Sequence, residues 1–543
     1  MSPYRVLDLT DERGQMTGLM LALLGAEVIL VEPPDGHRAR TLAPFMGDTP
    51  GPDRSLAFRA ANRGKKSVVL DVDLPEDRAR ILDLATGADI LVQSSPPGHL
   101  DALGLGYEEL ARRNPALIYV SISPFGTSGP KANWAATDLT VWAAAGPMAL
   151  TGDPDRAPLR ISVPQSFEHA ATQAAGAALL ALFERGRSGR GQHVDVSAQL
   201  ACTQATQSSV LNHFANAPLV TRAGGGIKAG EIFLRFVYPA KDGYVSVTHV
   251  FGAAVGPYSR RLMEWVHEAG FCDEATRDKD WIDYAMMLSN GRESLANFER
   301  VKDCVAAFTS SRTKAELQAG AQERRLLIAP IATTADVLAM EQMASRDYWQ
   351  VDDDGLRFPG VWAKASRTPL RQLTRAPRLG EHSEVVLGER ARQPVVVGGG
   401  SPTSAGPNEL PLAGVKVLDF MWAVAGPSTT RVLADYGATV VRVESSGRID
   451  AARAFQPFFN DQVGAENSSL FNSLNAGKLG LTLNLSKPEA REVVRDLVRW
   501  ADVALESFTP KAMKAFGLDY ESLRLVKPDL VMASSCLMGQ HGR

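Results

Sequence analysis

The sequence predicts an α/β fold in which a doubly wound parallel sheet is joined to a smaller domain, and it predicts that this arrangement is duplicated. Over the first 125 residues, short apolar segments typical of buried strands alternate with helical patterns, as in parallel sheets with helical crossovers. The opening pattern then returns after residue 411. The chain also has 543 residues, more than one hydrophobic core usually serves.

The first strand–helix–strand unit lies at the N-terminus. Residues 5–9 are short and apolar, residues 16–24 have helical character and end before Gly25, and residues 27–32 form a second apolar segment. The alternation continues with expected strands and helices at 67–70, 76–85, 89–92, 107–113 and 117–122. Such an order predicts a Rossmann-like sheet.

The middle of the chain has a different pattern. Residues 138–216 are expected to be mainly helical, strands are expected within 232–247, residues 255–345 are again mainly helical, and short strands follow at 352–363. We interpret residues 1–393 as one copy of the fold. Its large domain covers about 1–215, and the chain returns to that domain near 330–393. Its small domain covers about 216–330.

Residues 394–411 are crowded with Gly, Ser and Pro and keep no amphipathic period, which predicts an interdomain linker. Beyond it, Val417–Phe420 repeats the pattern of Val6–Leu9. Further matches hold a constant offset of 413 residues, and they are Gly64-Lys65 with Gly477-Lys478, Ala88-Asp89 with Ala501-Asp502, and Gly104-Leu105 with Gly517-Leu518. Matches in register over this length predict an internal duplication.

The second copy is predicted to be incomplete. At the same offset Arg543 falls opposite Pro130, a point at which no domain core is finished. We therefore expect residues 412–543 to be the N-terminal part of a second copy, and the chain to be a fragment.

Charge and composition exclude several classes of protein. The net charge is −3 and the pI about 6.4, whereas nucleic-acid binders usually carry a basic excess. None of the four cysteines lies in a CxxC pair, which argues against a zinc site or a disulfide framework. The N-terminus lacks a signal-peptide pattern, and the most apolar stretch, 174–183, is too short to cross a membrane. We expect a cytoplasmic protein without a metal.

Five stretches in a fixed order point to a family. They are LAGVKVLD with AGP, GA and VE (412–444), NAGK with LNL (475–485) and its counterpart at 62–70, SPFG with GP (123–130), SGRGQ with VDVS (188–197), and RLGEH (378–382). Together they resemble the family III CoA-transferases of the CaiB/BaiF type. That group includes formyl-CoA transferases, carnitine CoA-transferases and alpha-methylacyl-CoA racemases.

The resemblance implies a fold and a reaction. Members combine a large Rossmann-like domain with a small one, and two chains thread through each other as interlocked rings, a pairing that could be intrachain or homodimeric here. An aspartate attacks an acyl-CoA thioester and forms an acyl anhydride, then an aspartyl-CoA thioester that a carboxylic acid acceptor reopens. CoA or acyl-CoA is thus the implied substrate, bound at the carboxyl edge of the sheet.

The catalytic position departs from the family pattern. Counting back from the SGRGQ motif puts Phe167 where the family's aspartate is expected, with Glu168 and His169 beside it. Glu168 could act as a longer nucleophile, although one more methylene moves the attacking oxygen by roughly an ångström; it could equally be a helix-start carboxylate. The racemase branch needs His before Asp, and here the pair is Thr137-Asp138. Asp138 could line the pocket or only begin a helix.

Candidate CoA contacts come from both copies. In copy two the loop after the first strand keeps AGP and carries Trp422, Ala423 and Val424, whereas copy one has the acidic DERGQ at 11–15. Lysines at turns could pair with CoA phosphates, or could be solvated. The other candidates lie in the NAGK–LNL stretch (475–485) and in its counterpart at 62–70, and they are Lys65, Lys66, Leu70, Lys478 and Leu483. Gly224–Gly226 could correspond to the family's mobile glycine loop.

Three functions follow from these residues. The first is a CoA-transferase that passes CoA from an acyl-CoA to a carboxylic acid. The second is a non-catalytic acyl-CoA-binding partner, favoured by Phe167 and the acidic first loop. The third is a lyase, hydrolase or racemase relative that uses CoA chemistry for another reaction.

Overall fold

The computed structural model describes residues 1–252, 255–390, 392–395 and 409–542. The chain divides into two compact units, one made of Met1–Pro147, Ile161–Leu219 and Glu341–Arg543, the other of Met148–Arg160 and Val220–Met340. The small domain expected at about 216–330 overlaps the second unit, which also takes in residues 148–160. Most of the expected linker, residues 396–408, lies outside the described residues.

The first sheet is six-stranded and parallel throughout, in the order β3-β2-β1-β4-β5-β6. The strands are β1 (Arg5–Leu9), β2 (Glu27–Glu32), β3 (Lys66–Val69), β4 (Ile90–Gln93), β5 (Ile118–Ser123) and β6 (His193–Ser197). The central strand β1 pairs with two neighbours, so that Val6 lies opposite both Val28 and Ile90. The predicted doubly wound α/β sheet is confirmed, and its strands β1, β4 and β5 are buried along their whole length.

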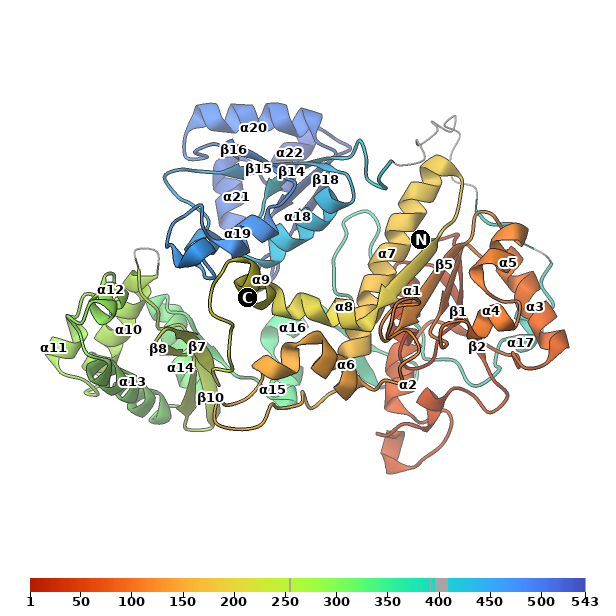
Figure 1. The fold of residues 1–543 in the computed structure, drawn as a ribbon, viewed down its shortest axis with the longest axis horizontal. Helices are drawn as coiled ribbons and strands as arrows, with labels where there is room; N and C mark the ends of the chain where they lie inside the picture. The colour runs from red at the N-terminus through yellow and green to blue at the C-terminus, as the bar shows by residue number, and fades with distance from the viewer. Residues whose placement is uncertain (253–254, 391, 396–408, 543) are drawn as a thin grey trace. The chain divides into compact units, whose positions relative to one another are not determined.

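Helices cover this sheet (Figure 1). They include α1 (Gln15–Leu23), α2 (Leu56–Ala61), α3 (Pro75–Thr86), α4 (His99–Ala102), α5 (Tyr107–Arg113) and α7 (Ser166–Ser188). The buried face of α7 is almost entirely alanine, so this helix packs closely on α1, where the Thr17 hydroxyl donates to the Ala171 carbonyl at 3.1 Å. Near residue 383 the chain returns to the edge strand β3 as α17 (Ser383–Leu387), and the Ser383 hydroxyl accepts the Val69 N–H at 3.0 Å.

Helices make up most of residues 138–216, as the sequence predicts, apart from the connection over 151–165 and one strand. The segment contains α6 (Asp138–Ala145), α7, α8 (Ala198–Thr203) and α9 (Gln207–Phe214), but residues 193–197 form the edge strand β6. In HVDVS the two valines alternate with polar residues, which is the period of a strand rather than a helix. The neighbouring helical patterns obscured this short alternation.

The second sheet lies within 412–543 and repeats the order of the first. Its five parallel strands run β16-β15-β14-β17-β18. They are β14 (Lys416–Phe420), β15 (Thr439–Glu444), β16 (Leu479–Thr482), β17 (Val503–Glu506) and β18 (Val531–Ser534), with helices α18 (Ala425–Asp435), α19 (Ser469–Leu474), α20 (Pro488–Trp500), α21 (Pro510–Phe516) and α22 (Tyr520–Val526).

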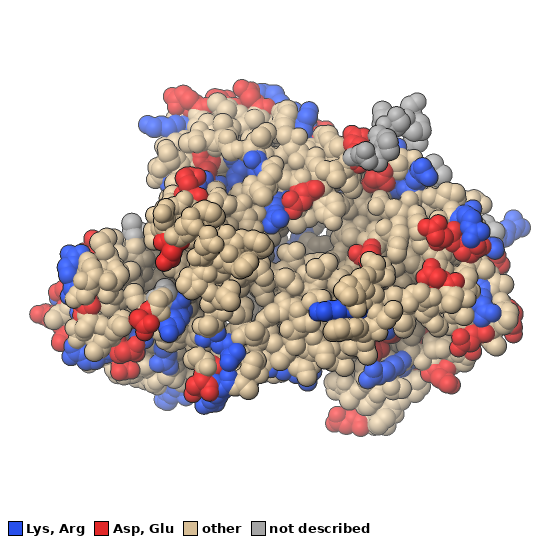
Figure 2. Space-filling model, viewed as in Figure 1, with Lys and Arg blue, Asp and Glu red and all other residues tan. Residues whose placement is uncertain are grey.

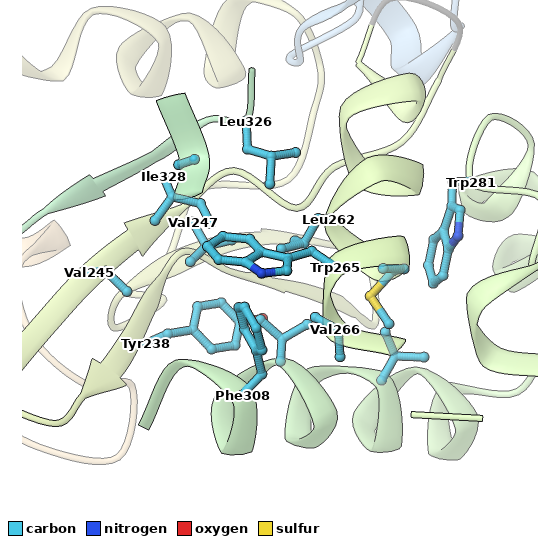
Figure 3. Packing of buried hydrophobic residues seen from close by; sticks show 14 of the residues in the cluster. Tyr238, Val245, Val247, Leu262, Trp265, Val266, Trp281, Phe308, Leu326 and Ile328 are labelled. Atoms are coloured by element: carbon cyan, nitrogen blue, oxygen red, sulfur yellow. The ribbon is translucent and has the colours of Figure 1, made fainter. Parts of the chain in front are cut away.

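The other unit has its own antiparallel sheet and core. Strands β9 (Val237–Ala240), β10 (Gly243–Val247) and β11 (Ile328–Pro330) pair in the order β11-β10-β9 beside the hairpin of β7 (Gly226–Ala229) and β8 (Ile232–Arg235). Its helices include α10 (Gly256–Glu268), α12 (Tyr284–Ser289), α13 (Leu295–Ser310) and α14 (Lys314–Arg324). Trp265 and Phe308 meet edge to face in the core, with ring centroids 4.8 Å apart (Figure 3).

Candidate functional site

The first place to look for a ligand is the point where the strand order of a doubly wound sheet reverses, at the carboxyl ends of the strands. In the first sheet this switch point lies between β1 and β4. The segments that leave it are residues 10–14 after β1 and residues 94–98 after β4. In the second sheet the corresponding segments follow β14 and β17.

The switch point of the first sheet is bridged by its own side chains. The Asp11 N–H donates to the Ser94 hydroxyl at 2.9 Å, and that hydroxyl donates to Asp11 Oδ1 at 2.9 Å. Arg13 donates through Nε to both Asp11 carboxylate oxygens at 2.9 Å, and through Nη2 to the Ser94 carbonyl at 2.9 Å. Burial alone would raise the pKa of Asp11, but the hydrogen bonds and charge of Arg13 hold that pKa below its usual value.

Asp138 fixes the start of α7. Its Oδ1 accepts the N–H groups of Gln165 and Ser166, both at 2.8 Å, and these are donors that the first turn of a helix leaves without partners. Its Oδ2 is buried and has no hydrogen-bond partner among the described residues. Asp138 is the first residue of α6, as one of the two alternatives expects, and its carboxylate also caps the start of α7.

The first turn of α7 presents Phe167, Glu168 and His169. The Arg13 guanidinium lies 6.0 Å from the centre of the Phe167 ring. His169 packs edge to face against Trp142, with ring centroids 5.4 Å apart. Glu168 is exposed to water, yet enough protein surrounds it that partial burial raises the pKa of its carboxyl. Among these three side chains, Glu168 alone offers an accessible carboxylate.

The two turn lysines, Lys65 and Lys478, are buried in ion pairs. Lys65 is fully buried, and its Nζ lies 2.9 Å from Asp8 Oδ2 and 2.7 Å from the Gln15 carbonyl. Lys478 Nζ lies 3.1 Å from Asp419 Oδ2 and 2.7 Å from the Thr430 hydroxyl. Burial lowers the pKa of both lysines, and the facing aspartates oppose that effect.

The expectation that these two lysines reach CoA phosphates therefore does not fit the geometry. A glycine before each lysine marks a turn, but this pattern does not reveal that the side chain points inward. The other candidates of the same signature are also apart from the switch points. Lys66 pairs with Glu27 at 2.6 Å, Leu70 is buried in the core of the first sheet, and Leu483 packs against the core of the second.

The second switch point keeps the loop of Trp422, Ala423 and Val424 at the end of β14. The Trp422 N–H donates to the Ser507 hydroxyl at 2.9 Å, as Asp11 does to Ser94. Ala423 is exposed and has a φ of +62°, an unusual conformation for a residue with a side chain. The buried Asp450 accepts its N–H at 3.1 Å, which holds this strained backbone in place.

Several residues of both loops were not singled out from the sequence. Arg13, Ser94 and Asp450 become important only through contacts with residues distant in the chain, although a serine after both β4 and β17 was a readable signal. The glycine run at 224–226 belongs to the other unit, where Gly224 and Gly225 have positive φ and Gly226 begins β7.

The described residues contain no cluster suited to a metal ion, and the face drawn in Figure 2 carries charges of both signs. No cluster of three or more His, Cys, Asp or Glu suited to a metal ion occurs among them. No helix in the described part of the chain is long and apolar enough to span a bilayer. Lys and Arg are interspersed with Asp and Glu over the face seen in Figure 2.

Comparison with known proteins gives a consistent result. The model of CoA-transferase family III matches residues 1–383 and 412–543. The chain is 35% identical over 396 residues to the succinyl-CoA:(R)-benzylsuccinate CoA-transferase subunit BbsE of Thauera aromatica, a match that covers 72% of the chain and 93% of the relative. It is 30% identical over 553 residues to a probable CoA-transferase of Mycobacterium tuberculosis, and this match covers 99% of the chain and 65% of that relative.

A solved structure agrees with these matches. A CaiB/BaiF family protein from Brucella suis aligns with a TM-score of 0.62 and 28% identity, covering 71% of the chain and 97% of the solved protein. The family predicted from the five sequence stretches is thereby confirmed, together with its α/β fold. The chain belongs to CoA-transferase family III.

Proposed function

We propose that the chain moves CoA from an acyl-CoA to a carboxylic acid through a carboxylate of its own, and that Glu168 is this carboxylate. The observation that carries the proposal is position. Glu168 is exposed in the first turn of α7 and adjoins Phe167, at the point where the family resemblance expects an aspartate. Its raised pKa makes the ionised form more basic, and therefore a better nucleophile.

The reaction balances without any oxidant or metal. The Glu168 carboxylate attacks the thioester carbonyl, the C–S bond breaks, and a mixed anhydride and CoA thiolate result. The thiolate then attacks the glutamyl carbonyl of the anhydride and releases the donor acid, leaving a glutamyl-CoA thioester. The acceptor carboxylate repeats both steps in reverse, so that a new acyl-CoA leaves and Glu168 is regenerated.

The relative with 35% identity suggests which substrates to try first. It is named for succinyl-CoA and (R)-benzylsuccinate, so we propose succinyl-CoA as donor and a substituted succinate as acceptor. We place CoA along the loop Trp422–Val424. Its accessible side chains and the absence of an acidic residue in it support this position.

A second candidate is a partner that binds acyl-CoA without performing the chemistry. Phe167 favours it, because a phenyl ring at the expected aspartate position cannot form an anhydride. In that case residues 1–393 and 412–543 would be two copies that pair as two chains do in the family. The shared strand order and the matching pairs Lys65–Asp8 and Lys478–Asp419 support the interpretation as two copies.

Intact-protein mass spectrometry separates the two candidates. The chain is incubated with succinyl-CoA, then treated with hydroxylamine, which converts an activated glutamyl group into a hydroxamate. We expect a hydroxylamine-sensitive adduct that maps to Glu168 and disappears in Glu168→Gln. Glu108→Gln is the matched control, because Glu108 is an exposed glutamate in the first turn of α5.

Either of two outcomes rejects Glu168 as the nucleophile. One is an adduct of unchanged yield in Glu168→Gln, which would require another carboxylate. The other is the absence of any adduct while CoA still binds, measured by calorimetry, which would support the partner function.

A further inference from the structure

The two switch points have the same framework but different contents. In each sheet, the strand next to the central one (β4 or β17) is followed by a serine. The hydroxyl of this serine accepts, at 2.9 Å, the backbone N–H of the second residue after the central strand (β1 or β14). These contacts are Asp11 to Ser94 Oγ in the first sheet and Trp422 to Ser507 Oγ in the second. The two loops therefore leave their sheets at equivalent places, and differences between them come from the side chains they carry.

In the first sheet these side chains lie across the switch point. Arg13 extends back across the loop to the Ser94 carbonyl, holds both oxygens of Asp11, and lies 6.0 Å from the Phe167 ring. Its side chain is 29% exposed, so most of it is enclosed. A loop, a strand end and the start of α7 are thus joined by an ion pair at the place where a ligand would enter.

Both cations near this switch point are already paired with carboxylates of the protein. The loop carries the two carboxylates of Asp11 and Glu12. Arg38, an exposed cation in the connection after β2, donates to Glu12 at 3.3 Å. Its positive charge is thereby matched within the protein, and a polyanion would have to displace Glu12 to use it.

The second switch point lacks these obstacles. Its loop has Trp422, Ala423 and Val424 in place of an acid–base pair, and Ala423 is exposed. Arg448, in the connection after β15, is exposed and lies 5.7 Å from the Trp422 ring. No carboxylate among the described residues pairs with it. An aromatic ring beside an unmatched guanidinium suits an adenine ring and a phosphate.

We infer that the chain binds one CoA, at the Trp422–Val424 loop, and that the Asp11–Arg13 pair closes the equivalent site of the first sheet. Asp11 and Arg13 then decide which of the two switch points accepts the substrate. This inference rests on the proposed function, because it takes CoA as the ligand.

The test is the stoichiometry of CoA binding to the full chain, by isothermal titration calorimetry. The wild type should bind one CoA. The double variant Trp422→Ala/Arg448→Ala should bind it at least tenfold more weakly. The triple variant Asp11→Ala/Glu12→Ala/Arg13→Ala removes the ion pair and also frees the exposed Arg38 from Glu12, so it should bind two. Circular dichroism and thermal melting confirm that each variant is folded.

The outcomes that overturn the inference are distinct from those that overturn the proposed function. Two CoA molecules on the wild type, unchanged binding in Trp422→Ala/Arg448→Ala, or a single CoA on folded Asp11→Ala/Glu12→Ala/Arg13→Ala each contradict the asymmetry and leave CoA transfer standing. No CoA binding by folded wild type contradicts the proposed function as well.

Discussion

The first and second sheets share their strand order, but they differ in what covers them. In the first sheet Thr17 on α1 is fully buried and β5 is buried along its length, because α7 and β6 lie against them. In the second sheet Thr429 on α18 is exposed, and Val531 on β18 is 61% exposed. Local sequence is enough to build the inner strands, whereas α7, which covers the first sheet, begins about 150 residues after α1.

The strongest test of this comparison is to break the ion pair that both sheets bury. Lys65→Met leaves Asp8 as an uncompensated buried charge and should cost about 3–5 kcal/mol. Lys478→Met should cost a similar amount, because the Lys478 side chain is only 2% exposed. Hydrogen exchange followed by mass spectrometry reads each sheet separately through peptides from β1 and β14. This is necessary because both sheets lie in the same unit of a chain that has two units, so one global unfolding curve would not distinguish them.

A matched control is the neighbouring lysine. Lys66 is 32% exposed and pairs with Glu27 near the surface, so Lys66→Met should change stability by about 1 kcal/mol or less. Equal losses in Lys65→Met and Lys66→Met would show that the buried pair is not what stabilises the first sheet.

These ion pairs also separate the features that could be predicted from the sequence from those that could not. Apolar segments and their alternation with helices predicted the strands of both sheets, because strand burial is a local pattern. The inward direction of Lys65 and the Arg13–Ser94 contact depend on residues 50 and 81 positions away. Such contacts have no local signature. Glu168 was identified only by its distance from the SGRGQ motif, and its exposure to water becomes visible only in the folded structure.

A second prediction concerns the other compact unit, which contains neither of the two parallel sheets. His249 is fully enclosed beside Phe251, Trp281 and Phe298, and neither ring nitrogen has a partner among the described residues. Burial lowers its pKa from 6.5 to about 4. The unfolded chain binds the proton first as the pH falls, so stability is lost between pH 6.5 and 4, by about 3 kcal/mol.

Urea unfolding followed by tryptophan fluorescence at pH 7 and at pH 4.5 measures this loss. In His249→Leu the titrating group is gone, and the decrease should be smaller by about 2–3 kcal/mol. The exchange of β1 and β14 peptides should not respond to this substitution. An identical acid sensitivity in wild type and His249→Leu would mean that other groups titrate instead.

A smaller effect is expected where α7 begins. Asp138→Ala removes the acceptor for the Gln165 and Ser166 N–H groups and should destabilise the first turn by about 1–2 kcal/mol. Exchange of amides in peptides covering residues 165–170 should then be faster. Asp138→Asn keeps an acceptor oxygen and should lie closer to wild type. Equal exchange in Ala, Asn and wild type would contradict the capping role.

The smallest expected effect compares one threonine in each sheet. Thr17→Val keeps the shape but removes a buried hydroxyl that donates to Ala171 at 3.1 Å, so it should cost about 1 kcal/mol. Thr429→Val alters an exposed residue whose hydroxyl donates to its own helix at Ala425, and should change stability by less than about 0.5 kcal/mol. Exchange of β1 and β14 peptides measures both. An equal loss at Thr429 would mean that the outer face of α18 is covered in solution as α7 covers α1, and the difference between the two sheets would then disappear.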